Sequence, residues 1–120
     1  MVLKEKQILQ LKRSLDRIYK LKSELLKLVS ESTNAAVLRS KIAEVLILLS
    51  SIVGYANPKS EELEEFLREA NLRFIGMEIE SSPWAAVEHE VQLFCDYINS
   101  TAFQFTKDGV KILVKKRKRA

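Results

Sequence analysis

The sequence predicts an α+β domain that is mainly helical: a long N-terminal antiparallel helical hairpin, two further helices and a small C-terminal β-hairpin. Its 120 residues, of which 47% are hydrophobic and 30% charged, are typical of one folded domain. Apolar residues recur at helical spacing in several stretches, and Asp108 followed by Gly109 is a strong signal for a tight turn. We expect one domain over residues 1–114, made of a helical hairpin (1–57) and helices plus β-hairpin (58–114), and then a basic tail (115–120).

The first predicted helix covers residues 2–30, which contain no Gly or Pro. Its apolar residues alternate at intervals of three and four, as in a coiled-coil seam, with Lys22 at the one polar position. The seam consists of Ile8, Leu11, Leu15, Ile18, Leu25 and Val29.

The second predicted helix covers residues 35–53 and is apolar on most sides, which is typical of a buried helix. Gly54 is expected to close it in the left-handed conformation. The first helix would extend about 15 Å beyond this partner. Ile8 and Leu11 in that extension need cover from the fourth helix, from the C-terminal strands or from a second copy of the chain. We therefore expect a homo-oligomer, most simply a dimer, that uses Ile8, Leu11, Leu15 and Ile18 for self-association.

The third predicted helix begins at Asn57 and Pro58 and ends near Asn71. Four glutamates in its first turns suit the positive end of the helix dipole and make residues 58–71 a possible contact for a basic protein partner. Alternation over residues 74–80 favours a short strand, which leaves open a three-stranded sheet.

The fourth predicted helix covers residues 83–99, and the β-hairpin follows it. If Asp108 and Gly109 form the two-residue turn, Phe105 faces Ile112 and Phe103 faces Val114. One face of the hairpin is then apolar, and the other carries Gln104, Thr106, Lys111, Leu113 and Lys115.

Catalysis has little support in the sequence. One cysteine, Cys95, excludes an internal disulfide, and one histidine, His89, has no metal-ligating residue one turn away. Glu78 and Glu80 would share one strand face, for which a charged surface is the simpler explanation. We expect no enzymatic activity, no cofactor and no metal site.

Charge is distributed very unevenly. Residues 1–30 carry a formal charge of +5 and residues 101–120 carry +6, whereas residues 58–100 carry −7. On the first helix, cations recur every seven residues opposite the apolar seam, and a solvated outer face is the alternative explanation for them. The cations that we expect to bind nucleic acid are Lys6, Arg13, Arg17, Lys20, Lys27, Lys111, Lys115, Lys116, Arg117, Lys118 and Arg119.

These observations predict a non-enzymatic, self-associating protein that contacts nucleic acid electrostatically, as DNA or RNA, in a larger nucleoprotein complex. Phe103 and Phe105 could stack on bases, but their pairing in the hairpin favours the core. The alternative is a structural adaptor whose first helix binds a partner protein. With a free thiol, no leader and no apolar stretch of membrane length, we expect an intracellular location, cytoplasmic or, in a eukaryote, nuclear, and no membrane contact.

Overall fold

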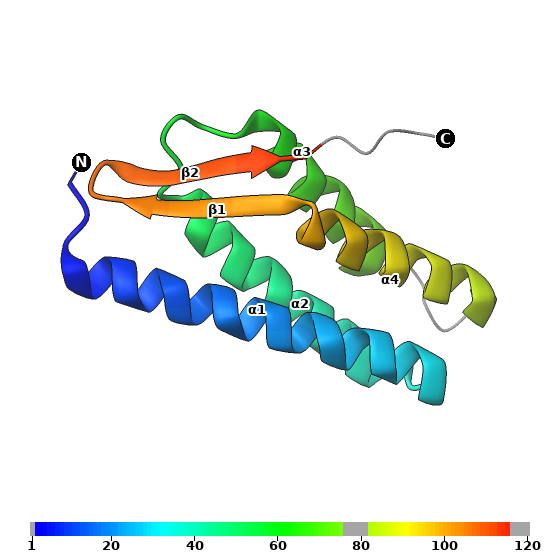
Figure 1. Ribbon diagram of the computed structural model, residues 1–120. Coiled ribbons are helices and arrows are strands. Elements are labelled where there is room, and N and C mark those ends of the chain that lie inside the picture. Colours follow the sequence, from blue (N-terminus) through cyan, green and yellow to red (C-terminus); the bar gives the residue numbers. More distant parts are fainter. Residues whose placement is uncertain (1, 76–81, 116–120) are drawn as a thin grey trace.

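The computed structural model describes residues 2–75 and 82–115, and its architecture is the predicted one, mainly helical with a small antiparallel sheet (Figure 1). The elements, in chain order, are α1 (Glu5–Glu31), α2 (Ala35–Val53), α3 (Glu61–Ala70), the π-helical turn η1 (Asn71–Ile75), α4 (Trp84–Asn99), β1 (Thr101–Thr106) and β2 (Gly109–Val114).

The antiparallel pair of α1 and α2 forms the centre of the fold, as expected. α1 begins at Glu5 rather than at residue 2, because Lys4 is its N-cap and donates its backbone N–H to the side chain of Gln7 at 2.9 Å. The bounds of α2 are those predicted. Its N-cap is Asn34, whose side-chain oxygen accepts a hydrogen bond from the backbone N–H of Val37 at 3.1 Å.

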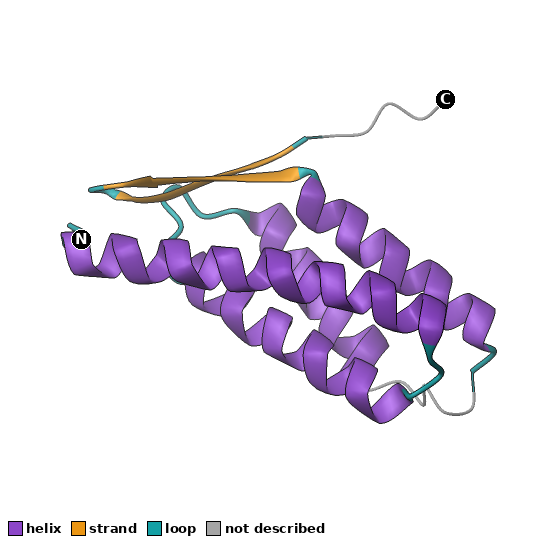
Figure 2. Cartoon of the chain, turned by 60° about the horizontal axis from the view of Figure 1, so that its bottom comes forward, coloured by secondary structure: helices purple, strands orange, loops and turns teal. Residues whose placement is uncertain are grey.

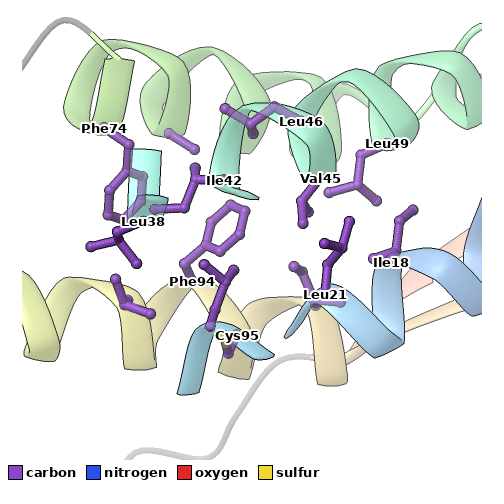
Figure 3. Packing of buried hydrophobic residues seen from close by; sticks show 14 of the residues in the cluster. Ile18, Leu21, Leu38, Ile42, Val45, Leu46, Leu49, Phe74, Phe94 and Cys95 are labelled. Carbon is purple, nitrogen blue, oxygen red and sulfur yellow. The ribbon is translucent and has the colours of Figure 1, made fainter. Parts of the chain in front are cut away.

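One core lies among α1, α2, η1 and α4 (Figure 3). Leu21 of α1 and Val45 of α2 face each other, and Phe94 of α4 enters the same cluster beside Ile42. All four side chains are buried, so α4 packs across the α1–α2 pair while α3 and η1 cover another side of α2.

The N-terminal extension of α1 is covered by the C-terminal hairpin, one of the three sources predicted. Leu3 is buried, and its backbone N–H donates to the carbonyl of Lys107 at 2.6 Å. Figure 2 shows the hairpin lying over the N-terminal half of α1, and β1 contacts that helix.

This cover removes the free seam on which the expected self-association depended. Leu11 is 5% exposed and Ile18 is fully buried, while Ile8 and Leu15 are half-buried against the same core. These four residues pack within the chain, so self-association stays a prediction that needs another surface.

The predicted start of the third helix was wrong. The third helix does not begin at Asn57 and Pro58. Ser60 is its N-cap and accepts from the N–H of Leu63 at 3.3 Å. The reason is a long-range contact. Asn57 N–H donates to Val110 O at 2.9 Å, and Val110 N–H donates to Tyr55 O at 2.8 Å. Residues 55–57 therefore pair with β2 and do not enter the helix.

Gly54 does not adopt the left-handed conformation. Its φ of −58° is right-handed, and its N–H donates to the carbonyl of Ser50 at 3.1 Å. The chain leaves α2 through a further turn, in which Tyr55 N–H donates to Ile52 O at 3.0 Å, so no left-handed residue is needed.

The strand predicted for residues 74–80 is wrong at its start. Phe74 and Ile75 belong to η1, which continues directly from α3. The helical path buries Phe74 edge-on against Phe94, with ring centroids 5.4 Å apart, and this aromatic contact outweighs the local alternation. Residues 76–80 lie outside the described part of the chain.

The hairpin has the predicted faces with a register shifted by two residues. Lys107 and Asp108 form the turn and Gly109 pairs with Thr106, so Phe103 faces Ile112 and Phe105 faces Val110. The Thr106 hydroxyl donates to Gly109 O at 2.8 Å and accepts from Asp108 N–H at 3.3 Å, which fixes the turn before Gly109. In the described residues the sheet has two strands.

Candidate nucleic-acid interface

The outer side of α1 carries a regular row of cations, Lys6, Arg13, Lys20 and Lys27, which we call the α1 cation row. All four side chains are exposed. Successive members are seven residues apart, which is about 10.5 Å of helical rise, and the whole row is about 32 Å long. The opposite side of the helix packs into the core through Leu11, Ile18 and Leu25, so the fold fixes the direction in which the row points.

Within residues 2–75 and 82–115, no member of the α1 cation row forms an ion pair. Asp16 lies on the same side of the helix, between Arg13 and Lys20, and lowers the positive potential at that point. Glu24 and Glu31 lie one turn from Lys27 in the same way, so carboxylates of α1 offset part of the positive charge of the row, although none of them forms an ion pair with it in the described residues.

Arg17 differs from the row that it was predicted to join. Its guanidinium donates to both carboxylate oxygens of Glu44 on α2, at 2.9 and 3.3 Å. The hydrogen bond raises the pKa of Arg17 and lowers that of Glu44. Because Glu44 accepts both hydrogen bonds, Arg17 joins α1 to α2, and part of its charge is balanced within the fold.

The second set of predicted cations lies on the hairpin. Lys111 and Lys115 are exposed on the sheet face that points away from the core. Phe103 and Phe105 are on the other face and pack against the core, so they are not a platform for bases. Lys116, Arg117, Lys118 and Arg119 lie outside the described part of the chain.

These two sets lie on different elements. Figure 2 shows α1 and the hairpin next to each other, and each set lies opposite the face with which its own element packs. The α1 cation row is therefore the longer and more regular of the two described basic surfaces, with Lys111 and Lys115 as a separate one.

Of the residues considered for catalysis, the structure describes His89 and Cys95, which differ in exposure. His89 is exposed, and its neighbour Glu90 accepts from Arg73 at 2.7 Å. No group of His, Cys, Asp and Glu in the described residues could hold a metal ion. Cys95 is buried, as predicted for a core residue, and burial raises the pKa of its thiol to about 12. Glu78 and Glu80 lie outside the described residues.

The sequence reasoning missed a groove of about 610 Å³ between α2 and the α3–η1 segment. α2 contributes Ala43, Ile47 and Ser50 to it, and the facing wall includes Leu67, Asn71 and Ile75. One feature of the sequence indicates the groove. Residues 45–49 are all apolar, and a single buried face of a helix cannot hold five consecutive residues, so Ile47 is left exposed.

Comparisons of the chain with protein-family models, with curated protein sequences and with solved structures found no match. In the described residues, no helix combines the length and the apolar character needed to cross a bilayer.

Proposed function

We propose that the protein binds nucleic acid through the α1 cation row, with Lys111 and Lys115 as a second contact, within a larger nucleoprotein assembly. One observation carries the proposal: four exposed cations without ion pairs in the described residues stand at equal intervals on a helix held rigid by the core.

The chemistry of the row suits a phosphate backbone rather than base edges. A duplex presents one negative charge per about 1.7 Å of its axis, so each cation of the row has several phosphates within reach. Lysine ammonium groups on a convex helix face bind as point charges, and such contacts position a protein without reading sequence. We therefore expect binding that depends strongly on salt and weakly on sequence.

The test is a charge reversal in the row, Arg13→Glu, Lys20→Glu and Lys27→Glu together. Binding of a fluorescent duplex of about 20 base pairs, and of the matching single strand and RNA duplex, is followed by anisotropy over a range of salt concentrations. The four cations of the row should contribute about −3.6 to the slope of log K against log salt for duplex DNA. The triple variant should bind at least tenfold more weakly, and the magnitude of its slope should be smaller by about 2.7.

The matched control reverses three exposed cations elsewhere, Lys59, Arg68 and Lys107, and so changes the net charge equally. If the control weakens binding as much as the triple variant does, the attraction is one of net charge only, and the row is not the site. If the wild type binds none of the three probes at low salt, the proposal fails.

The alternative adaptor finds less support on α1 than the sequence suggested. The apolar face of α1 is packed inside the fold. The large apolar side chains exposed along the described helix are Leu9 and Leu26, which lie on different sides of it and form no row for a partner helix.

A further inference from the structure

The groove between α2 and the α3–η1 segment is lined mainly by apolar side chains. Ile47 is 70% exposed on its α2 wall, and Ile75 is partly exposed on the other wall. Leu46 and Leu67 are less exposed and lie deeper between them. Exposed apolar side chains that gather in a concave surface indicate a binding site rather than ordinary surface composition.

The dimensions of the groove match a helix. From Ala43 to Ser50 the α2 wall rises about 10.5 Å, which is two helical turns. Both of these end residues are small, so a second backbone can come close, and Ile47 stands between them as a single large contact. A helix that presents apolar residues at i, i+4 and i+7 fits such a groove.

The two walls differ in charge, and this difference identifies the occupant. α3 has five glutamates and one arginine, a formal charge of −4. Glu64 is three residues before Leu67 and four before Arg68, so it is on the groove side of the helix, and Glu61 lies one turn further. Arg68 is ion-paired with Glu65 and adds little positive charge. The α2 residues that line the groove, Ala43, Leu46, Ile47 and Ser50, are uncharged.

We propose that this groove binds an amphipathic helix of a partner protein that is basic along one flank. Its apolar side chains pack on Ile47 and Ile75, and its Lys or Arg side chains face Glu61 and Glu64. A second copy of α1 would supply the positive charge but not the apolar row, because its exposed large apolar side chains, Leu9 and Leu26, lie on different sides of the helix. The partner is therefore a different chain. The groove does not include the α1 cation row, so this proposal stands independently of nucleic-acid binding.

The test uses two designed peptides of about four helical turns with leucine at i, i+4 and i+7. One carries lysine along one flank, and the other carries glutamate at the same positions. Each is labelled and titrated with the full chain at about 0.15 M salt, and binding is read by fluorescence anisotropy. The lysine peptide should bind at least fivefold more tightly than the glutamate peptide.

Two variants locate the peptide. Ile47→Asp should weaken binding of the lysine peptide at least tenfold, because it places a charge in the apolar contact. Leu113→Asp is the matched control: Leu113 is 64% exposed on the hairpin, and its replacement should leave binding unchanged. Both side chains project into solvent, so both variants should keep the wild-type circular dichroism spectrum and melting temperature. Glu61→Lys with Glu64→Lys should reverse the preference between the two peptides.

Three outcomes would overturn the proposal. Equal loss of binding in the Ile47 and Leu113 variants would place the peptide elsewhere. Equal binding of the lysine and glutamate peptides would remove the acidic wall from recognition. A wild-type dimer in sedimentation that becomes monomeric with Ile47→Asp would show that a second copy fills the groove.

Discussion

Replacing Leu11 by alanine tests whether the N-terminal half of α1 packs within the chain or against a second copy. The structure places Leu11 in the core, 5% exposed, at the point where α1 extends under the C-terminal hairpin. The variant should therefore destabilise the protein itself and not an interface.

The expected magnitude follows from burial. Leucine to alanine removes three carbons, worth about 2.4 kcal/mol of transfer free energy, and the cavity left behind raises the cost to about 3 kcal/mol. For a chain of 120 residues, an unfolding entropy of about 2.1 cal/mol/K per residue converts this loss into a fall of about 12 °C in melting temperature. Leu72→Ala is the matched control. Leu72 is 71% exposed, so its replacement should move the midpoint by less than about 2 °C.

The assay is thermal unfolding by circular dichroism at two protein concentrations a hundredfold apart. We expect wild-type and Leu11→Ala midpoints that do not depend on concentration and differ by about 12 °C. A wild-type midpoint that rises with concentration, together with a Leu11→Ala variant that melts within about 3 °C of the dilute wild type, would refute the intramolecular packing of this residue.

Three further predictions address single contacts. The Cys95 thiol should not react with a thiol reagent at pH 8 in the native protein and should react fully in denaturant, because burial both shields it and holds its pKa at about 12. Gly109→Ala should destabilise the protein by about 2 kcal/mol in urea unfolding, because Gly109 has φ of 136° and an added Cβ would lie 2.7 Å from the carbonyl of Tyr55. Glu44→Gln should be less stable than the wild type at pH 7. Arg17 lowers the folded-state pKa of Glu44 below its usual 4.5, so the ion pair stabilises the fold above that value. This stabilisation is lost as pH falls through the lower folded-state pKa, and the urea midpoints of the wild type and the variant should then converge. A gap that persists at pH 2 would contradict the ion-pair explanation.

The features that could be predicted from the sequence are those with a local cause. The 3-4 spacing of apolar residues predicted the α1–α2 pair, and the bounds of α2 were correct because Asn34 caps it through a bond to Val37, three residues away. The faces of the hairpin were also correct, since a register error of two residues keeps each side chain on its own face.

The errors arose where a contact distant in sequence competes with a local signal. Asn57 and Pro58 are a good local start for a helix, but Val110 on β2 holds this segment through backbone hydrogen bonds. Phe74 lies in an alternating stretch, yet its aromatic contact with Phe94 is made in a helical path.

The candidate site shows the same division. The α1 cation row follows from periodicity alone, and its members are exposed as predicted. Compensation of Arg17 by Glu44 depends on how α1 and α2 are placed side by side, and 27 residues separate the two. The groove between α2 and the α3–η1 segment depends on how far apart these packed elements lie, and no residue pattern in the sequence predicts that distance.

The hydrogen bond from Leu3 to Lys107 has a consequence for biosynthesis. About 100 residues must be translated after Leu3 before its partner exists, which takes roughly 5–20 s at ordinary elongation rates. During that interval the N-terminal end of α1 lacks the cover that the hairpin gives it in the folded chain. We therefore expect this end of α1 to become protected from proteolysis only after residue 107 has been translated.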